Sequence, residues 1–223
     1  MLMKVTVIIP SCSSQRIPLL TGTIDSILAS TYRDVYPVII ADGNEEIYKT
    51  IKDKYYMRLL GVFLNVDRKD WVYSINHVLK SLKSDYYIYA SDDLIFPPDC
   101  IENAVNVMQR DYPDGDGVVS IGRKNRCVFG LMGNKFINRF PDRQVFCPDY
   151  IHYCSDSELL GTVKRLGKLT YPPDRQCQVK HFRMKDETWR LARRARTRDR
   201  EIHRERQEKG YQWGIDFNRV TGR

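Results

Sequence analysis

The first half of the chain alternates between β-branched runs and segments in which apolar residues recur at helical spacing, and this alternation constrains the fold more than any other feature. Four runs predict strands, at residues 4–10, 35–41, 58–66 and 86–90. Four helices are predicted between and after them, over residues 17–31, 45–56, 70–83 and from residue 97 onward. Because helices that join parallel strands also cover them, the sequence predicts an α/β fold with a mostly parallel sheet and helices on both faces.

The second half is less regular. Loops and short strands are expected over 122–154, a helix over 155–167, and short extended pieces at 168–174 and 178–182. Ser155 or Asp156 can cap that helix, and Gly167 is a typical end for it.

The composition changes after residue 182. Eleven Lys or Arg and six Asp or Glu fall between residues 183 and 209, so most of the formal net charge of +8 resides there. We therefore predict a main domain over residues 1–182 and a basic C-terminal extension, helical or flexible, over residues 183–223. Clustered Lys and Arg attract anionic surfaces, so contact with a membrane, a nucleic acid or an acidic polymer is one expectation for the extension.

The same composition bears on location. No apolar run approaches the roughly 20 residues that span a bilayer, and the N-terminus lacks the pattern of a signal peptide. The six cysteines form no CxxC pair, which argues against a zinc site or a disulfide framework. These features predict a cytoplasmic protein with reduced cysteines, with peripheral contact at a membrane as the second option.

Polar residues follow three of the predicted strands directly: Ser11, Asp42, Asp92 and Asp93. Because the carboxyl ends of parallel strands share one edge of the sheet, where ligands bind, these side chains are expected on one rim. Two adjacent carboxylates each raise the cost of ionising the other, which predicts a cation beside Asp92 and Asp93. A divalent metal that bridges to substrate phosphates fits hard carboxylate oxygens, whereas a solvated turn with one aspartate capping a helix is the alternative.

The ordered set of motifs identifies a family. "VTVIIPSCSSQRIPLLTGTIDSILASTYRDVYPVIIADGN" resembles the opening of inverting glycosyltransferases of family 2, "ASDDL" is similar to their metal-binding Asp-x-Asp motif, and "SDSELLGTVKRLGKLTYPPD" to their acidic motif at the head of a helix. The likeness runs from residue 4 to about residue 182. It implies a Rossmann-like GT-A fold and an enzyme that moves a hexose from a nucleotide-diphosphate sugar to an acceptor hydroxyl, with inversion of configuration at the anomeric carbon.

The resemblance also implies roles for the residues on the rim. Four residues would bind the donor nucleotide: Pro10 and Ser11 as the wall of its pocket, Asp42 at the base, and Asp92 at the ribose or the metal. A simple turn aspartate is the alternative for Asp42. The likeness favours a uridine over a guanosine diphosphate sugar, and it leaves the sugar and the acceptor (a glycan, lipid or protein) open.

For the reaction itself, the resemblance implies that Asp93 and His181 hold Mn²⁺ or Mg²⁺, which neutralises the diphosphate leaving group. Asp156 would be the general base that removes the proton of the acceptor hydroxyl. An N-cap role is the alternative for Asp156, Glu158 is the alternative base, and a packed or surface histidine is the alternative for His181.

The sequence departs from the family pattern in two places. "ADGN" lacks the first of two aspartates often found there, and "SINHVL" has Ile75 and Val78 where Arg and Gly are commoner. The segment 129–140 resembles an acceptor-side loop in which Gly130 and Gly133 let the backbone approach a substrate.

Two other functions remain open. One is a nucleotidyltransferase, although "SCSSQRIP" lacks the glycine-rich loop usual after its first strand. The other is an inactive module that binds a nucleotide sugar or a polyanion.

Overall fold

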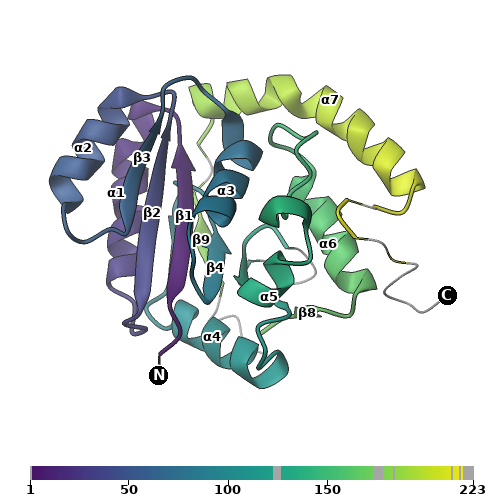
Figure 1. Ribbon diagram of the computed structural model, residues 1–223. Helices are drawn as coiled ribbons and strands as arrows, with labels where there is room; N and C mark the ends of the chain where they lie inside the picture. Colours follow the sequence, from purple (N-terminus) through teal and green to yellow (C-terminus); the bar gives the residue numbers. More distant parts are fainter. Residues whose placement is uncertain are drawn as a thin grey trace.

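The computed structural model describes residues 2–122, 127–172, 178–182, 184–211, 213–215 and 217, and its centre is a seven-stranded sheet (Figure 1). The sheet has the order β3-β2-β1-β4-β7-β6-β8. Its strands are β1 (Val5–Ser11), β2 (Val35–Asp42), β3 (Gly61–Asn65), β4 (Tyr86–Tyr89), β6 (Val118–Ser120), β7 (Gly130–Gly133) and β8 (Leu169–Thr170). Strands β3, β2, β1 and β4 are parallel, and β7 runs antiparallel to both β4 and β6. A separate antiparallel pair joins β5 (Leu94–Ile95) to β9 (Lys180–His181).

Helices cover both faces of the sheet. They are α1 (Ile17–Leu28), α2 (Glu45–Tyr55), α3 (Asp70–Ser81), α4 (Cys100–Asp111), α5 (Asn134–Ile137), α6 (Ser155–Arg165) and α7 (Glu187–Glu208), with short 3-10 turns η1 (Ser14–Arg16) and η2 (Pro141–Arg143). Alternate residues of β1 enter two cores, because successive side chains of a strand point to opposite faces. Val7 and Ile9 pack with α1, α2 and α4, whereas Ile8 packs with α3, α5 and α6. The predicted α/β architecture is confirmed.

The segment 129–140 is not the loop that the sequence predicted. It forms β7 and α5, and both Gly130 and Gly133 are buried between neighbouring chain segments. A Cβ on Gly133 would lie 2.0 Å from the carbonyl oxygen of Gly115. The glycine therefore permits close packing of two backbones, and the expectation that it approaches a substrate was wrong.

The predicted cap of α6 was also wrong. The N-cap position belongs to Cys154, whose φ of 66° lies in the left-handed region and whose side chain makes no capping hydrogen bond. Ser155 and Asp156 instead begin the helix, so the N-cap alternative for Asp156 does not apply. The extended pieces appear as β8 and β9, while residues 173 and 174 of the first piece lie outside the described residues.

The C-terminal extension is helical over most of its described part. Figure 1 shows α7 running along the upper edge of the molecule, from the carboxyl end of the parallel strands to the region of α6. Ala192, Ala195 and Asp199 are buried against the rest of the chain. Arg183 and residues 218–223 lie outside the described residues, and the boundary at residue 182 remains a prediction. No helix in the described ranges has the length and apolar character to cross a membrane.

Candidate active site

Strands β1 and β4 bring the predicted rim residues together. The two strands pair in parallel, so Ser11 at the end of β1 lies beside the segment that follows β4. The Ser11 hydroxyl donates a hydrogen bond of 2.6 Å to Oδ2 of Asp92. Both Asp92 and Asp93 are buried, at 3% and 5% exposure, so their charges require compensation within the protein.

Arg16 is the cation beside the two aspartates. Its Nη1 lies 2.6 Å from Oδ1 of Asp92 and 3.3 Å from Oδ2 of Asp93, and its Nε lies 2.5 Å from Oδ2 of Asp186. The guanidinium is itself buried. The sequence analysis expected a cation here but did not identify Arg16, whose only sequence signal was a single arginine in the polar loop after β1.

The environment separates the two aspartates electrostatically. Burial raises the pKa of Asp92 above its ordinary value, against the opposing effects of Arg16 and Ser11. Burial also acts to raise the pKa of Asp93, but hydrogen bonds from His181 and Ser91 and the nearby positive charges outweigh it and lower that pKa. Asp93 is therefore the carboxylate of the pair that stays ionised more readily.

The pairing of β5 with β9 brings His181 to Asp93. Leu94 is the register partner of His181, and the backbone N–H of Phe182 donates to the carbonyl oxygen of Asp93 at 2.8 Å. His181 Nε2 then lies 3.2 Å from Oδ1 of Asp93. Two ligands at right angles on an octahedral ion, each about 2.1 Å from it, lie about 3 Å apart.

Asp93 and His181 are thus the two residues here that could hold a divalent ion. No group of three or more His, Cys, Asp or Glu suited to a metal occurs within the part of the chain that the structure describes. Two protein ligands suit an ion that takes its remaining ligands from substrate phosphates and water.

Asp42 is already bound within the chain. Its Oδ1 accepts hydrogen bonds from Asn65 Nδ2 and the backbone N–H of Lys69, and its Oδ2 accepts one from the backbone N–H of Asp70, each at 2.8 Å. These bonds fix the connection from β3 to α3. Pro10 is buried inside the sheet, opposite Ile40 in register. Contacts of Pro10 and Asp42 with a nucleotide remain predictions.

A cavity of about 360 Å³ opens at this edge of the sheet. Three predicted site residues from distant parts of the chain line it: Asp93, Asp156 and His181. The other four, Pro10, Ser11, Asp42 and Asp92, are not among its lining residues. The wall also includes residues that the sequence analysis did not select, namely Arg16, Trp71, His152, Tyr153, Thr188 and Trp189.

Three of these additional residues have defined environments. The Trp71 indole donates to the carbonyl oxygen of Ala90 at 3.2 Å and packs edge-on against Phe146, which fixes one aromatic wall. Burial lowers the pKa of His152, which favours the neutral imidazole. Trp189 enters from α7, and the guanidinium of Arg193 lies 4.6 Å from its ring centre.

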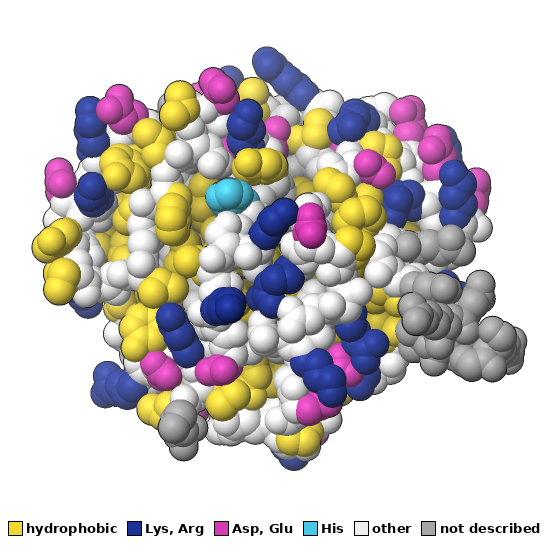
Figure 2. All heavy atoms as spheres, viewed as in Figure 1, with side chains coloured by type: hydrophobic (Ala, Val, Ile, Leu, Met, Phe, Trp, Pro, Cys, Tyr) yellow, Lys and Arg dark blue, Asp and Glu magenta, His cyan; other side chains and the backbone are white. Residues whose placement is uncertain are grey.

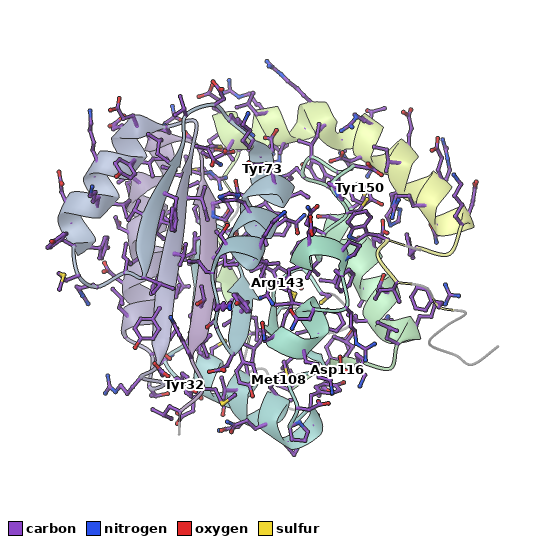
Figure 3. The ribbon with its side chains drawn as sticks, in the orientation of Figure 1. Tyr32, Tyr73, Met108, Asp116, Arg143 and Tyr150 are labelled. Atoms are coloured by element: carbon purple, nitrogen blue, oxygen red, sulfur yellow. The ribbon has the colours of Figure 1, made fainter. Side chains whose placement is uncertain are left out.

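Asp156 and Glu158 lie in different surroundings on the first turn of α6. Glu158 is buried away from the cavity, where it accepts hydrogen bonds from Tyr150 at 2.7 Å and from two nitrogens of Arg206 at 2.8 Å each. Figure 3 shows Tyr150 below α7, on the side of the molecule that carries α6. Glu158 therefore attaches α7 to α6, whereas Asp156 faces the cavity.

A mostly parallel sheet with an acidic pair after its fourth strand and a cavity at its carboxyl edge is the GT-A architecture of glycosyltransferases. The chain belongs to glycosyl transferase family 2, whose model matches residues 6–160.

Two curated relatives are glycosyltransferases by name. A glucosyl-dolichyl phosphate glucuronosyltransferase of Haloferax volcanii is 29% identical over 121 residues, which is 54% of this chain and 37% of that protein. An uncharacterised glycosyltransferase of Rickettsia typhi is 25% identical over 87 residues, covering 39% of this chain and 27% of that one. The chain therefore matches only about a third of the length of these relatives.

Solved structures share the fold. A mannosyltransferase from Pyrobaculum calidifontis, in complex with GDP-mannose and Mn²⁺, matches with a TM-score of 0.67 and 18% identity over 86% of this chain and 61% of that one. TarS residues 1–349 from S. aureus, in complex with UDP-GlcNAc, matches with a TM-score of 0.65 and 14% identity over 83% of this chain and 60% of that one. These likenesses establish the GT-A fold.

Proposed function

We propose that the protein is a metal-dependent, inverting glycosyltransferase that moves a sugar from a nucleotide-diphosphate sugar to an acceptor hydroxyl. The observation that carries the proposal is the shared cavity of Asp93, His181 and Asp156, which come from the turn between β4 and β5, from β9 and from α6. A direct displacement at an anomeric carbon requires a site for the leaving group and a base in the same cavity.

Asp93 and His181 would hold Mn²⁺ or Mg²⁺. When bound, such an ion supplies Lewis-acid stabilisation of the departing diphosphate. Arg16 holds Asp92 and the Oδ2 side of Asp93, whereas Oδ1 of Asp93 accepts a hydrogen bond from Ser91 at 2.6 Å and lies 3.2 Å from His181 Nε2. An ion held by Asp93 and His181 would therefore replace their direct contact.

Asp156 would act on the acceptor. In this assignment its carboxylate removes the proton of the acceptor hydroxyl as the oxygen attacks the anomeric carbon from the side opposite the diphosphate, which inverts the configuration. The aromatic rings of Trp71 and Trp189 supply apolar surface on which a sugar ring can lie. The family likeness favours a uridine diphosphate sugar, and the sugar and the acceptor remain to be identified.

Calorimetry with UDP and with GDP tests the metal assignment. We expect binding in the presence of Mn²⁺, and binding at least about tenfold weaker in excess chelator, because the diphosphate charge would then lack its partner. Asp93→Asn should lose the metal-dependent part of the nucleotide binding. Asp67→Asn, which changes an exposed aspartate on the connection from β3 to α3, is the matched control and should bind as the parent does. Equal affinity with metal and with chelator would rule out the metal assignment.

The two alternative functions make different predictions. A nucleotidyltransferase would release inorganic diphosphate from a nucleoside triphosphate, whereas a transferase of the proposed type releases the nucleoside diphosphate. An inactive binding module would bind the nucleotide sugar without turnover. Product analysis of the parent protein therefore separates the three.

We also propose that α7 holds the protein at an anionic bilayer. Five arginines between residues 190 and 200 are exposed, Arg190, Arg193, Arg194, Arg198 and Arg200, and Figure 2 shows Lys and Arg side chains, with Asp and Glu among them, along the upper edge where α7 runs. The acidic residue of the same stretch, Asp199, is buried. A cytoplasmic location, with this peripheral contact, is the corresponding proposal.

A further inference from the structure

Asp199 is a fully buried carboxylate in the middle of α7, at 0% exposure. It accepts three backbone hydrogen bonds from consecutive residues of another segment. Its Oδ1 accepts from the N–H of Ile151 at 3.1 Å, and its Oδ2 accepts from the N–H groups of His152 and Tyr153 at 2.9 and 2.8 Å. Three converging amides are strong enough partners to keep a carboxylate buried.

The segment that Asp199 holds leads directly into the candidate active site. His152 and Tyr153 line the cavity, Cys154 follows in the left-handed region with φ 66°, and α6 then begins at Ser155. A non-glycine residue in that region costs about 1–2 kcal/mol and persists only where its surroundings impose it. The bonds to Asp199 are such a constraint, because they fix the three residues immediately before Cys154.

Other contacts connect α7 to the same site. At its N-terminus, Asp186 accepts from the Arg16 guanidinium that also holds Asp92. Toward its C-terminus, Arg206 pairs with Glu158 on α6. Asp199 lies between these two contacts, and it is the one that acts on the backbone turn before Asp156.

We propose that Asp199 is a positioning residue for the transfer reaction. Its carboxylate fixes the turn over residues 151–153, and the turn sets the start of α6 so that Asp156 faces Asp93 and His181 across the cavity. The role in transfer rests on the proposed function, whereas the effect on the turn can be measured without any activity.

Amide hydrogen exchange tests the effect on the turn. Asp199→Asn preserves size but replaces one acceptor oxygen with a donor, so at least one of the three N–H groups loses its partner. We expect exchange in peptides covering residues 150–156 to become at least about tenfold faster, with β1 and α4 unchanged. Glu201→Gln, an exposed change on the same helix, is the control, and its exchange should match the parent. Parent-like exchange of residues 150–156 in Asp199→Asn would overturn the proposal.

A second variant separates the turn from general loosening of α7. Arg206→Gln removes the pairing with Glu158 but leaves the bonds to Asp199 in place. Exchange in residues 151–153 should then remain within about twofold of the parent. If Arg206→Gln accelerates it as much as Asp199→Asn does, the whole helix holds the turn and the specific role of Asp199 is refuted. If Asp199→Asn does not fold, Asp199→Ser is measured in the same way.

Kinetics test the role in transfer. For Asp199→Asn we expect kcat to fall about tenfold or more and KM for the nucleotide sugar to stay within about twofold, because a displaced base affects the reaction more than donor binding. The pH profile should also shift on the limb that reports the base, which a smaller folded fraction cannot produce. An unchanged kcat and pH profile, alongside faster exchange, would limit Asp199 to a structural role.

A parent protein without turnover on any nucleotide sugar would count against the proposed function. Amide hydrogen exchange would still decide whether Asp199 holds the turn.

Discussion

Arg16 Nη1 lies 2.6 Å from Oδ1 of Asp92 in a buried environment, so the chain itself supplies a cation for its acidic pair. The same guanidinium reaches Asp93 and Asp186, which ties the end of β4 to the start of α7. Burial acts to lower the pKa of Arg16, and the neighbouring carboxylates outweigh it, so the guanidinium stays charged. Its removal would leave three carboxylates close together without that partner.

Arg16→Gln should therefore destabilise the fold and make its stability depend on a divalent metal. We expect the free energy of unfolding to fall by about 3 kcal/mol, the usual scale for breaking a buried ion pair. Excess Mn²⁺ should restore part of this loss, because the freed carboxylates are hard oxygen ligands. Denaturant unfolding with Mn²⁺ and with chelator measures both effects. Arg68→Gln is the control, since its partly exposed pair with Asp70 should contribute less than about 1 kcal/mol. Unchanged stability of Arg16→Gln would contradict this prediction.

Asp156→Asn should separate chemistry from donor binding. If Asp156 is the base, turnover should fall about 10²-fold or more while calorimetric binding of nucleotide diphosphate stays close to the parent value. Ser157→Ala, an exposed change on the same helical turn, is the control. Parent-like transfer by Asp156→Asn would exclude it as the base.

Glu158→Gln should affect stability more than turnover. The variant keeps the size of the side chain but loses the charge that pairs with Arg206, so we expect about 1–3 kcal/mol lower stability. Turnover per folded molecule should change much less than in Asp156→Asn. If Glu158→Gln is instead folded and inactive while Asp156→Asn is active, the two roles must be exchanged.

Asp116 should contribute stability that disappears in acid. It accepts from Arg139 at 2.6 and 2.5 Å and lies 2.9 Å from Lys168 Nζ, and these partners, Arg139 first, lower its pKa from 3.8 to about 2. Figure 3 shows it near α5, at the end of the molecule away from α7. A lowered pKa stabilises the fold above the unfolded value, and this stabilisation is lost as the pH falls through the folded value.

Denaturant unfolding of Asp116→Asn checks this pH dependence. At pH 7 the variant should be about 2 kcal/mol less stable than the parent, and the difference should shrink between about pH 4 and pH 2. Asp114→Asn, which removes a largely exposed pair with Lys135, is the control and should cost less than about 1 kcal/mol. A difference that stays constant over this pH range would refute the electrostatic explanation.

The exposed arginines of α7 should control binding to anionic vesicles. A triple variant, Arg190→Gln, Arg194→Gln and Arg200→Gln, should weaken partitioning onto phosphatidylserine-containing vesicles about 100-fold, at roughly 1 kcal/mol for each charge near the surface. Lys49→Gln, an exposed change on α2, is the control. Sedimentation with vesicles of defined composition measures the effect. Equal binding to neutral vesicles, or preferential binding to duplex DNA, would contradict the membrane proposal.

The sequence alone predicted the elements around the site because the relevant signals are local. The β-branched runs and the helical spacing of apolar residues predicted β1 to β4 and α1 to α4, and parallel pairing then placed Ser11 and Asp92 on one rim. The same reasoning placed Asp156 at the head of α6, although the cap of that helix depended on a left-handed Cys154 that no local pattern indicated.

Tertiary structure decided how charged residues meet. Arg16 and Asp186 are 170 residues apart, and Asp199 contacts amides 46 to 48 residues away, so their pairing depends on the path of the whole chain. The sequence of α7 has too few apolar residues for an ordinary buried stripe. Several of the contacts that attach this helix to the rest of the protein are instead made by charged groups. The sequence does not distinguish a buried aspartate from an exposed one. Only the groups that surround the carboxylate in the folded chain decide whether it can be buried and belong to a site.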